Sequence, residues 1–165
     1  MAQARNEKER HAGRARTPMF SWFKRILAWR PFRAASRGAT GEALAAEFLR
    51  RERGFAVVVR NWRSPRDRRA ELDLVCRDGE VLVFVEVKTR TAGALVPGYY
   101  AINRRKKRAL LRACQAYLAH LAARPLTYRL DVVEVALPAT LAPGGTAPEL
   151  HHFENVPLFS RHDRG

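Results

Sequence analysis

The sequence has few cysteines, few acidic residues and no long apolar run, and each shortage narrows the class of protein. Two cysteines, Cys76 and Cys114, occur in 165 residues. That is too few for a disulfide framework and is typical of a reducing compartment. No stretch of about eighteen apolar residues is present, so no membrane-spanning helix is predicted. The basic N-terminus also lacks the apolar stretch of a secretory signal. We therefore expect a cytoplasmic protein with both thiols in its core.

Acidic residues are the second shortage. The chain has 16 Asp and Glu against 31 Lys and Arg, a formal net charge of +15. A surface of this sign attracts polyanions, with nucleic acid as the first candidate and an anionic membrane as the second. A basic surface that only keeps the protein soluble is the alternative. Hydrophobic content is an ordinary 47%, and this length allows one domain with a real core.

The basic charge is concentrated near the N-terminus, and this divides the chain. We expect a basic, largely disordered arm over residues 1–37, a globular domain over 38–157 and a disordered tail over 158–165. Within the arm, aromatic and aliphatic residues at helical spacing predict a short amphipathic helix over 19–32. Such a helix could lie on an anionic membrane, on nucleic acid or on its own domain. The sequence does not rank these alternatives.

Periodicity and turn residues predict an α/β domain. Strands are rich in β-branched residues and helices carry an apolar stripe, which gives the order α-β-β-β-α-β-β. A passage from strand to helix to strand usually joins parallel strands, so we expect a mixed sheet flanked by helices. The predicted helices cover residues 38–54, with Gly54 as the C-terminal stop, and 104–123. The predicted strands cover 55–63, 71–77, 80–90, 127–137 and 150–156.

The hairpin "ELDLVCRDGEVLVFVEVKTR", residues 71–90, carries charges in an otherwise apolar segment. If Asp78 and Gly79 form a two-residue turn, Glu71 lies directly across from Glu86. Side chains that face each other or alternate along a strand share one side of the sheet. One side then receives Glu71, Asp73, Glu86 and Lys88, and the other receives Leu72, Leu74, Val83, Val85 and Val87.

Carboxylates gathered in this way must protonate or find a cation. A divalent ion neutralises them better than one lysine, and oxygen ligands favour Mg²⁺ or Mn²⁺. Lys88 beside such an ion could polarise a phosphate or orient a water. The alternative is an exposed sheet face on which Glu86 and Lys88 are ordinary surface charges and Glu71 forms a salt bridge.

Two further features point toward the same chemistry. Glu42 lies at the margin of the apolar stripe of the first helix, where it could reach the sheet or could simply be an acid near a helix N-terminus. In the second helix, Gln115 could look toward the acids. The run "RRKKR" lies at the start of that helix, where positive charges are repelled by the helix dipole and by one another. A bound polyanion would relieve this repulsion, and a solvated basic face is the alternative. The predicted backbone-phosphate contacts are Arg90, Arg104, Arg105, Lys106, Lys107 and Arg108.

The pattern D-(x)12-E-x-K on a hairpin, preceded by a helical glutamate, resembles the PD-(D/E)xK nuclease superfamily. The segments "GATGEALAAEFL", "RNWR", "ELDLV", "FVEVKTR", "ACQAYL" and "RLDVVEV" together resemble the YraN family of uncharacterised bacterial proteins. That family is in turn similar to archaeal Holliday junction resolvases. The resemblance covers about Gly38 to Phe153.

The resemblance implies a restriction-endonuclease-like fold and a metal-dependent endonuclease that hydrolyses phosphodiesters in branched or structured DNA. The alternative is a non-catalytic nucleic-acid-binding accessory protein of the same fold. Asp73 and Glu86 would bind Mg²⁺ or Mn²⁺, and Glu42 would assist the metal site directly or through water. Lys88 would help to activate water, and Gln115 would support the site. A homodimer would suit cleavage of two strands, and no small-molecule cofactor is implied. One departure is Ala70, where the family usually has glycine; a positive φ there would strain the entry to the acidic strand.

Overall fold

A computed structural model describes residues 36–93, 103–141 and 145–158. The predicted arm helix over 19–32 and nearly all of the predicted tail lie outside these ranges. The elements are α2 (Arg37–Glu52), β1 (Ala56–Arg63), β2 (Glu71–Asp78), β3 (Val81–Thr91), α3 (Arg104–His120), β4 (Tyr128–Leu137) and β5 (Glu149–Phe153). Their order confirms the predicted succession of helices and strands. No helix in the described part of the chain is long and apolar enough to cross a membrane.

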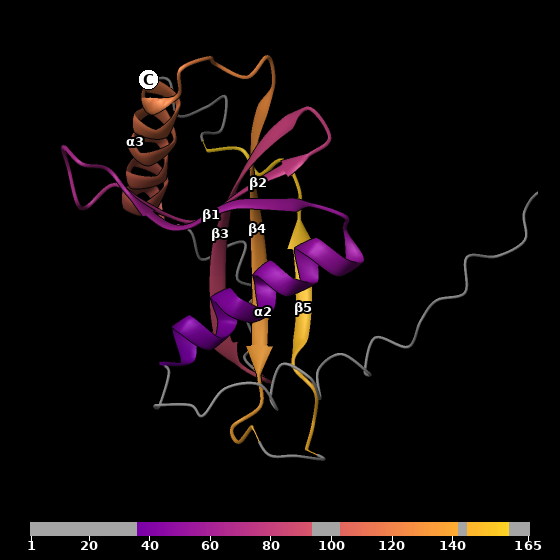
Figure 1. Cartoon of the computed structure of the whole chain (residues 1–165). Coiled ribbons are helices and arrows are strands. Elements are labelled where there is room, and N and C mark those ends of the chain that lie inside the picture. The colour runs from indigo at the N-terminus through magenta and orange to yellow at the C-terminus, as the bar shows by residue number, and fades with distance from the viewer. Residues whose placement is uncertain (1–35, 94–102, 142–144, 159–165) are drawn as a thin grey trace, which may run out of the picture. The chain divides into compact units, whose positions relative to one another are not determined.

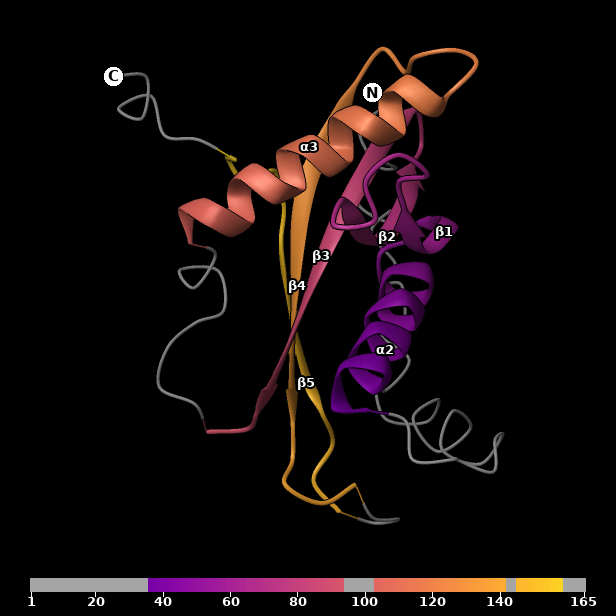
Figure 2. The same ribbon diagram turned by 90° about the vertical axis from the view of Figure 1, so that its left-hand side faces the viewer.

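The five strands form one mixed sheet in the order β1-β2-β3-β4-β5 (Figure 1). β3 and β4 are parallel and are joined through α3, while the other neighbouring pairs are antiparallel. Seen nearly edge-on, the sheet has α2 on one side and α3 on the other (Figure 2). The predicted mixed sheet with flanking helices is therefore confirmed.

The register of the β2–β3 hairpin differs from the prediction by two residues. Asp78 pairs with Val81, so the turn is Gly79–Glu80 and not Asp78–Gly79. Gly79 has a φ of +56° at the first turn position, the place where a type II′ turn requires glycine. The predicted Asp78–Gly79 turn has glycine at the second turn position. A shift of two residues preserves the alternation of faces along the strands but changes the partners. Leu72, predicted on the other face, nevertheless belongs to the core beneath α3.

In the register of the structure, Glu71 does not face Glu86 and is not part of the acidic group. Glu71 pairs with Arg63 across β1 and β2, and its Oε2 lies 3.0 Å from the Arg63 Nη2 atom. Hydrogen-bonded pairing of β2 with β3 ends at Leu74 and Val85. One step further along this register, Asp73 takes the place opposite Glu86 that had been assigned to Glu71.

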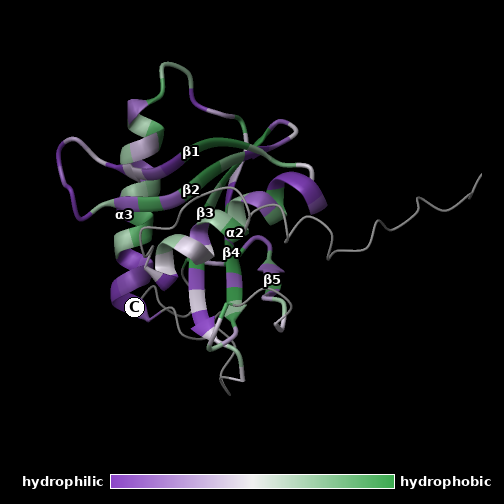
Figure 3. Ribbon diagram, turned by 60° about the horizontal axis from the view of Figure 1, so that its bottom comes forward, coloured by the Kyte–Doolittle hydropathy of each residue, from purple (hydrophilic) through white to green (hydrophobic). Residues whose placement is uncertain are grey.

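The face beneath α3, which carries the charged residues of the hairpin, is also a packed core. Tyr117 of α3 packs edge-on against Trp62 and Phe84, with ring centroids 5.2 and 5.7 Å apart. Hydrophobic residues are concentrated on the central strands and the inward side of the helix (Figure 3). Buried residues of this layer include Leu72, Val75, Leu82, Phe84, Leu110, Ala113, Cys114, Leu130 and Val132. Both cysteines are buried as expected, and burial raises the pKa of each thiol to about 12.

The opposite face is covered by α2, which approaches β3 closely because its packing residues are small. Ser36 caps the helix by accepting a hydrogen bond from the Ala39 amide at 3.2 Å. Gly41 is buried, and a Cβ atom added there would lie 1.9 Å from Thr89 Oγ1. This contact fixes the first turns of α2 against the half of β3 that carries Lys88.

Asp131, in the "RLDVVEV" motif, is fully buried and serves the fold. Its carboxylate accepts hydrogen bonds from Arg129 and from the Asn155 amide, and it lies 2.9 Å from His152 Nε2. Burial alone would raise its pKa, but these partners hold the pKa below its usual value. The network ties β4 to β5 and to the segment that follows.

Candidate metal and phosphate site

Glu86 lies at the centre of the candidate site. Its side chain is 2% exposed, although it is charged. Oε1 lies 2.7 Å from the ammonium of Lys88 and 2.9 Å from that of Lys106. Oε2 is buried and has no hydrogen-bond partner among the described residues. A buried carboxylate oxygen without a partner is costly, so this position is suited to a cation.

Asp73 is the second acid of the site. Its Oδ2 accepts a hydrogen bond of 2.7 Å from the Val87 amide, at the point where β2 and β3 cease to pair. Burial and the neighbouring Glu86 charge raise its pKa to about 6, against the opposing effects of the Val87 hydrogen bond and Lys106. Ionisation of this carboxyl therefore costs free energy until a cation arrives.

Lys106 has a role that the sequence reading missed. It was predicted to contact backbone phosphate, but its ammonium reaches inward to Glu86 from the first turn of α3. The Asn103 side chain caps this turn and accepts a hydrogen bond from the Lys106 amide at 2.9 Å. The spacing contained the signal, since Lys106 precedes Leu110 by four residues and Ala113 by seven, and both are buried.

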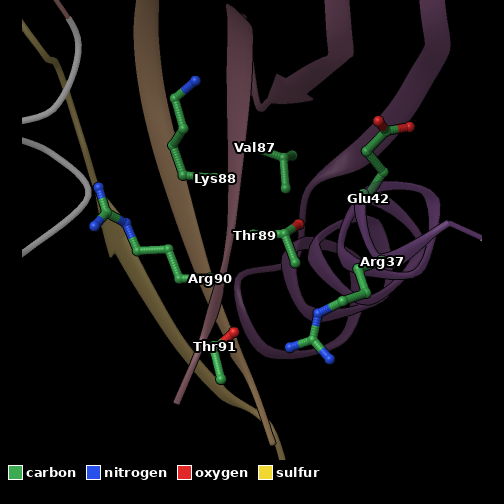
Figure 4. Close-up of a pocket in the computed structure, with 8 residues that line it drawn as sticks. Arg37, Glu42, Val87, Lys88, Thr89, Arg90 and Thr91 are labelled. Carbon is green, nitrogen blue, oxygen red and sulfur yellow. The ribbon is translucent and has the colours of Figure 1, made fainter. Parts of the chain in front are cut away.

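Lys88 and Glu42 lie on different sides of β3. Figure 4 shows Lys88 and Arg90 pointing to one side of the strand, and Thr89 pointing to the side where α2 carries Glu42. An open pocket lies here between α2 and the second half of β3, lined in part by Arg37, Glu42 and Lys88. Burial is the largest cause of the raised pKa of Asp73, followed by the charge of Glu86. The charge of Glu42 also raises this pKa, by the smallest contribution.

The other predicted residues are distributed around the site. Gln115 is exposed on α3, about 180° around the helix axis from Lys106, so the structure does not bring it to the acids. Arg90 is half-buried, and its Nε atom lies 3.3 Å from Glu134 Oε1. On the first turns of α3, the side chains that face solvent are those of Arg104, Arg105 and Arg108, while Lys107 is half-buried.

The donor set fits a magnesium ion in part. Asp73 has a raised pKa and Glu86 has an unpartnered Oε2 atom, and Mg²⁺ is commonly held by one or two carboxylates together with waters and phosphate oxygens. Across the described ranges, no group of three or more His, Cys, Asp or Glu side chains is gathered closely enough to hold a metal. Direct or water-mediated participation of Glu42 in the metal site stays a prediction.

The entry to β2 is not strained at Ala70. In the described part of the chain, only Asn61 and Asn155 have positive φ outside glycine. Ala70 is buried, and its amide donates to the Asp67 carbonyl at 2.9 Å. Alanine is therefore accommodated here, and the departure from the family pattern does not displace Asp73.

A central mixed sheet between two helices, with an acid–acid–lysine cluster where two strands part, is a nuclease-like arrangement. Comparison with known proteins identifies the family. The model of the uncharacterised protein family UPF0102 matches residues 41–135. The chain belongs to this family, the YraN family, which is a PD-(D/E)xK nuclease-like family.

Individual relatives extend the match. A UPF0102 protein of Geobacter metallireducens is 36% identical over 121 residues, which cover 73% of this chain and 91% of that protein. A UPF0102 protein of Anaeromyxobacter dehalogenans is 42% identical over 116 residues, or 70% of this chain and 79% of the relative. One from Beutenbergia cavernae is 48% identical over 98 residues, or 59% and 80%. The range matched by the family model, residues 41–135, includes the whole candidate site.

Proposed function

We propose that the protein is a metal-dependent endonuclease that hydrolyses phosphodiester bonds in DNA. The observation that carries the proposal is the buried Glu86 carboxylate, which has an unpartnered Oε2 and two lysines at Oε1. Beside it, Asp73 is a carboxyl whose pKa is raised to about 6. Buried acids and lysines together suit binding of a divalent cation and a phosphate.

In this proposal each side chain has a separate task. Asp73 and Glu86 hold Mg²⁺ or Mn²⁺, which when bound supplies Lewis-acid chemistry at a phosphoryl oxygen. Lys88 orients the attacking water or holds a phosphate oxygen, because its ammonium lies at the edge of the site and is partly exposed. Glu42 adjusts the charge of the site from α2.

The net charge of +15 and the exposed arginines at the start of α3 support a nucleic-acid substrate. The resemblance to junction resolvases favours branched DNA and a homodimer, and a DNA substrate would place the protein in the cytoplasm. The second candidate is a DNA-binding accessory protein without catalysis. Lys106 favours it, since its ion pair with Glu86 neutralises part of the charge that a metal would meet.

A panel of substrates tests the proposal. Purified protein is incubated with junction, flap, single-stranded and plain duplex DNA in Mg²⁺, in Mn²⁺ and in chelator, and products are resolved on denaturing gels. We expect metal-dependent cleavage of at least one branched substrate, and its loss in the Lys88→Ala variant. Tight binding in chelator with no cleavage of any substrate would favour the accessory protein.

A further inference from the structure

The connection between β1 and β2 carries a second basic cluster. Residues 64–70, here called the arginine loop, expose Arg66, Arg68 and Arg69 to solvent. None of these three side chains forms a hydrogen bond or ion pair with another residue in the ranges 36–93, 103–141 and 145–158. The loop contains one acid, Asp67, so it has a local excess of positive charge. The proposed contacts of the nuclease site do not use this charge.

The arginine loop has a defined backbone conformation. Ser64 is 6% exposed, and its Oγ accepts hydrogen bonds from the amides of Arg66 and Asp67 at 3.3 and 3.4 Å. Asp67 Oδ1 accepts from the Arg69 amide at 3.0 Å. The Ser64 amide donates to the Ala70 carbonyl and closes the loop at 3.0 Å. A loop held in this way presents its arginines with little further loss of backbone entropy on binding.

The loop is placed close to the candidate site. Ala70 is buried in the core beneath α3, and β2 begins at the next residue. Asp73 follows two residues later, roughly 7 Å along an extended strand. The loop therefore lies near the acids along the chain, which suits a polyanion that passes over the site.

The chemistry of the loop favours a phosphate backbone over a lipid surface. Arginine binds phosphate in a bidentate manner through its planar fork of donors. Membrane-binding segments usually add aromatic or long aliphatic side chains that enter the lipid. The exposed loop residues 65–69 are Pro, Arg, Asp, Arg and Arg, and their hydrophilic colour marks the tip of the loop in Figure 3.

We propose that the arginine loop is a second contact for the nucleic-acid backbone, in addition to the basic start of α3. This inference rests on the proposed function in that it assumes the same DNA substrate. It adds three arginines, at positions 66, 68 and 69, to the binding surface predicted from the basic helix.

Binding measured by fluorescence anisotropy tests the inference. Full-length protein is titrated onto a labelled four-way junction in chelator, at several salt concentrations. For the variant Arg66→Gln/Arg68→Gln/Arg69→Gln we expect affinity to fall roughly tenfold or more, and the slope of log K against log salt to lose about 0.9 for each phosphate contact removed. The control is Arg50→Gln/Arg51→Gln/Arg53→Gln, which removes the same charge at the end of α2 and should change affinity much less.

A second variant separates loop order from loop charge. Ser64→Ala keeps all three arginines but removes the acceptor that fixes the loop. We expect it to weaken binding severalfold with an unchanged salt slope. If the triple loop variant binds the junction like wild type, or if the α2 control loses as much affinity, the inference is wrong.

The result is independent of catalysis. If wild type cuts DNA and the loop variant binds as well as wild type, the inference fails and the nuclease proposal stands. If wild type binds without cutting and the loop variant loses binding, the nuclease proposal fails and the loop contact stands. Flotation with vesicles containing phosphatidylserine completes the test, because loop-dependent vesicle binding without loop-dependent DNA binding would overturn the inference in favour of a membrane role.

Discussion

Replacing Asp73 with asparagine is expected to abolish most DNA cleavage and, at the same time, to stabilise the metal-free protein. Asparagine can still accept the hydrogen bond from the Val87 amide, but it carries no charge beside Glu86. Loss of an ion ligand that provides several kcal/mol of transition-state stabilisation should lower the cleavage rate roughly a thousandfold. Single-turnover cleavage of a branched substrate measures this loss.

The stability gain follows from the pKa of Asp73. In the folded protein it is raised from 3.8 to about 6, so an ionised Asp73 destabilises the fold above pH 6. This penalty shrinks as the pH falls from about 6 to about 4 and is absent below that, because the carboxyl is then protonated in both the folded and unfolded states. At pH 8 the Asp73→Asn variant should gain roughly 2 kcal/mol, or about 5 to 10 °C in the unfolding midpoint.

The control for this prediction is Glu80→Gln, which removes one negative charge from an exposed position in the hairpin turn. We expect it to change the unfolding midpoint little at any pH. If Asp73→Asn and Glu80→Gln have the same unfolding midpoint in chelator at pH 8, the ionised Asp73 carboxylate does not destabilise the folded protein. Thermal unfolding between pH 4 and pH 8 separates these outcomes.

Replacing Gly41 with alanine is expected to destabilise the protein, although alanine is the better helix former. The new Cβ would lie 1.9 Å from Thr89 Oγ1 and 3.0 Å from Thr89 Cβ, so α2 must move away from β3. Overpacking of this kind typically costs about 1 to 3 kcal/mol, more than the roughly 0.5 to 1 kcal/mol gained from replacing a helical glycine. The displacement would also move Glu42, the next residue.

Gly38 provides a matched control in the same helix. A Cβ atom there has only Ser36 Oγ within 4 Å, at 3.8 Å, so Gly38→Ala should be neutral or stabilising by about 0.5 kcal/mol. Denaturant unfolding measures both variants. In the double variant Gly41→Ala/Thr89→Ala, removal of Oγ1 should restore part of the lost stability. Equal stability of the two alanine variants would contradict the close contact of α2 with β3.

Most of the fold could be predicted from the sequence because local signals agree with one another. β-branched runs separated by turn residues define the strands, and Gly54, with a φ of +75°, follows α2 as predicted. The hairpin register could not be settled by the same means. "DGE" allows glycine at either central position of a two-residue turn, and only the backbone conformation distinguishes the two.

The sequence predicted which residues form the candidate site better than it predicted the contacts between them. The pattern around Asp73, Glu86 and Lys88 identified the residues, since a shift of two in register preserves the face. The position of Lys106 depends on how α3 docks on the sheet, which a list of basic residues does not contain. Whether Glu42 and Gln115 support the site stays a prediction, and Gln115 faces solvent in the structure.

Calorimetric titration of Mn²⁺ into the metal-free protein is the most direct measurement of the site. At pH 7.5 we expect tight binding that is lost in the Glu86→Gln variant, because Glu86 is the buried acid with an unpartnered oxygen. At pH 5 the affinity of wild type should fall, since Asp73, with a pKa of about 6, is then largely protonated. Binding by Glu86→Gln with the affinity and pH dependence of wild type would contradict a metal site at these two carboxylates.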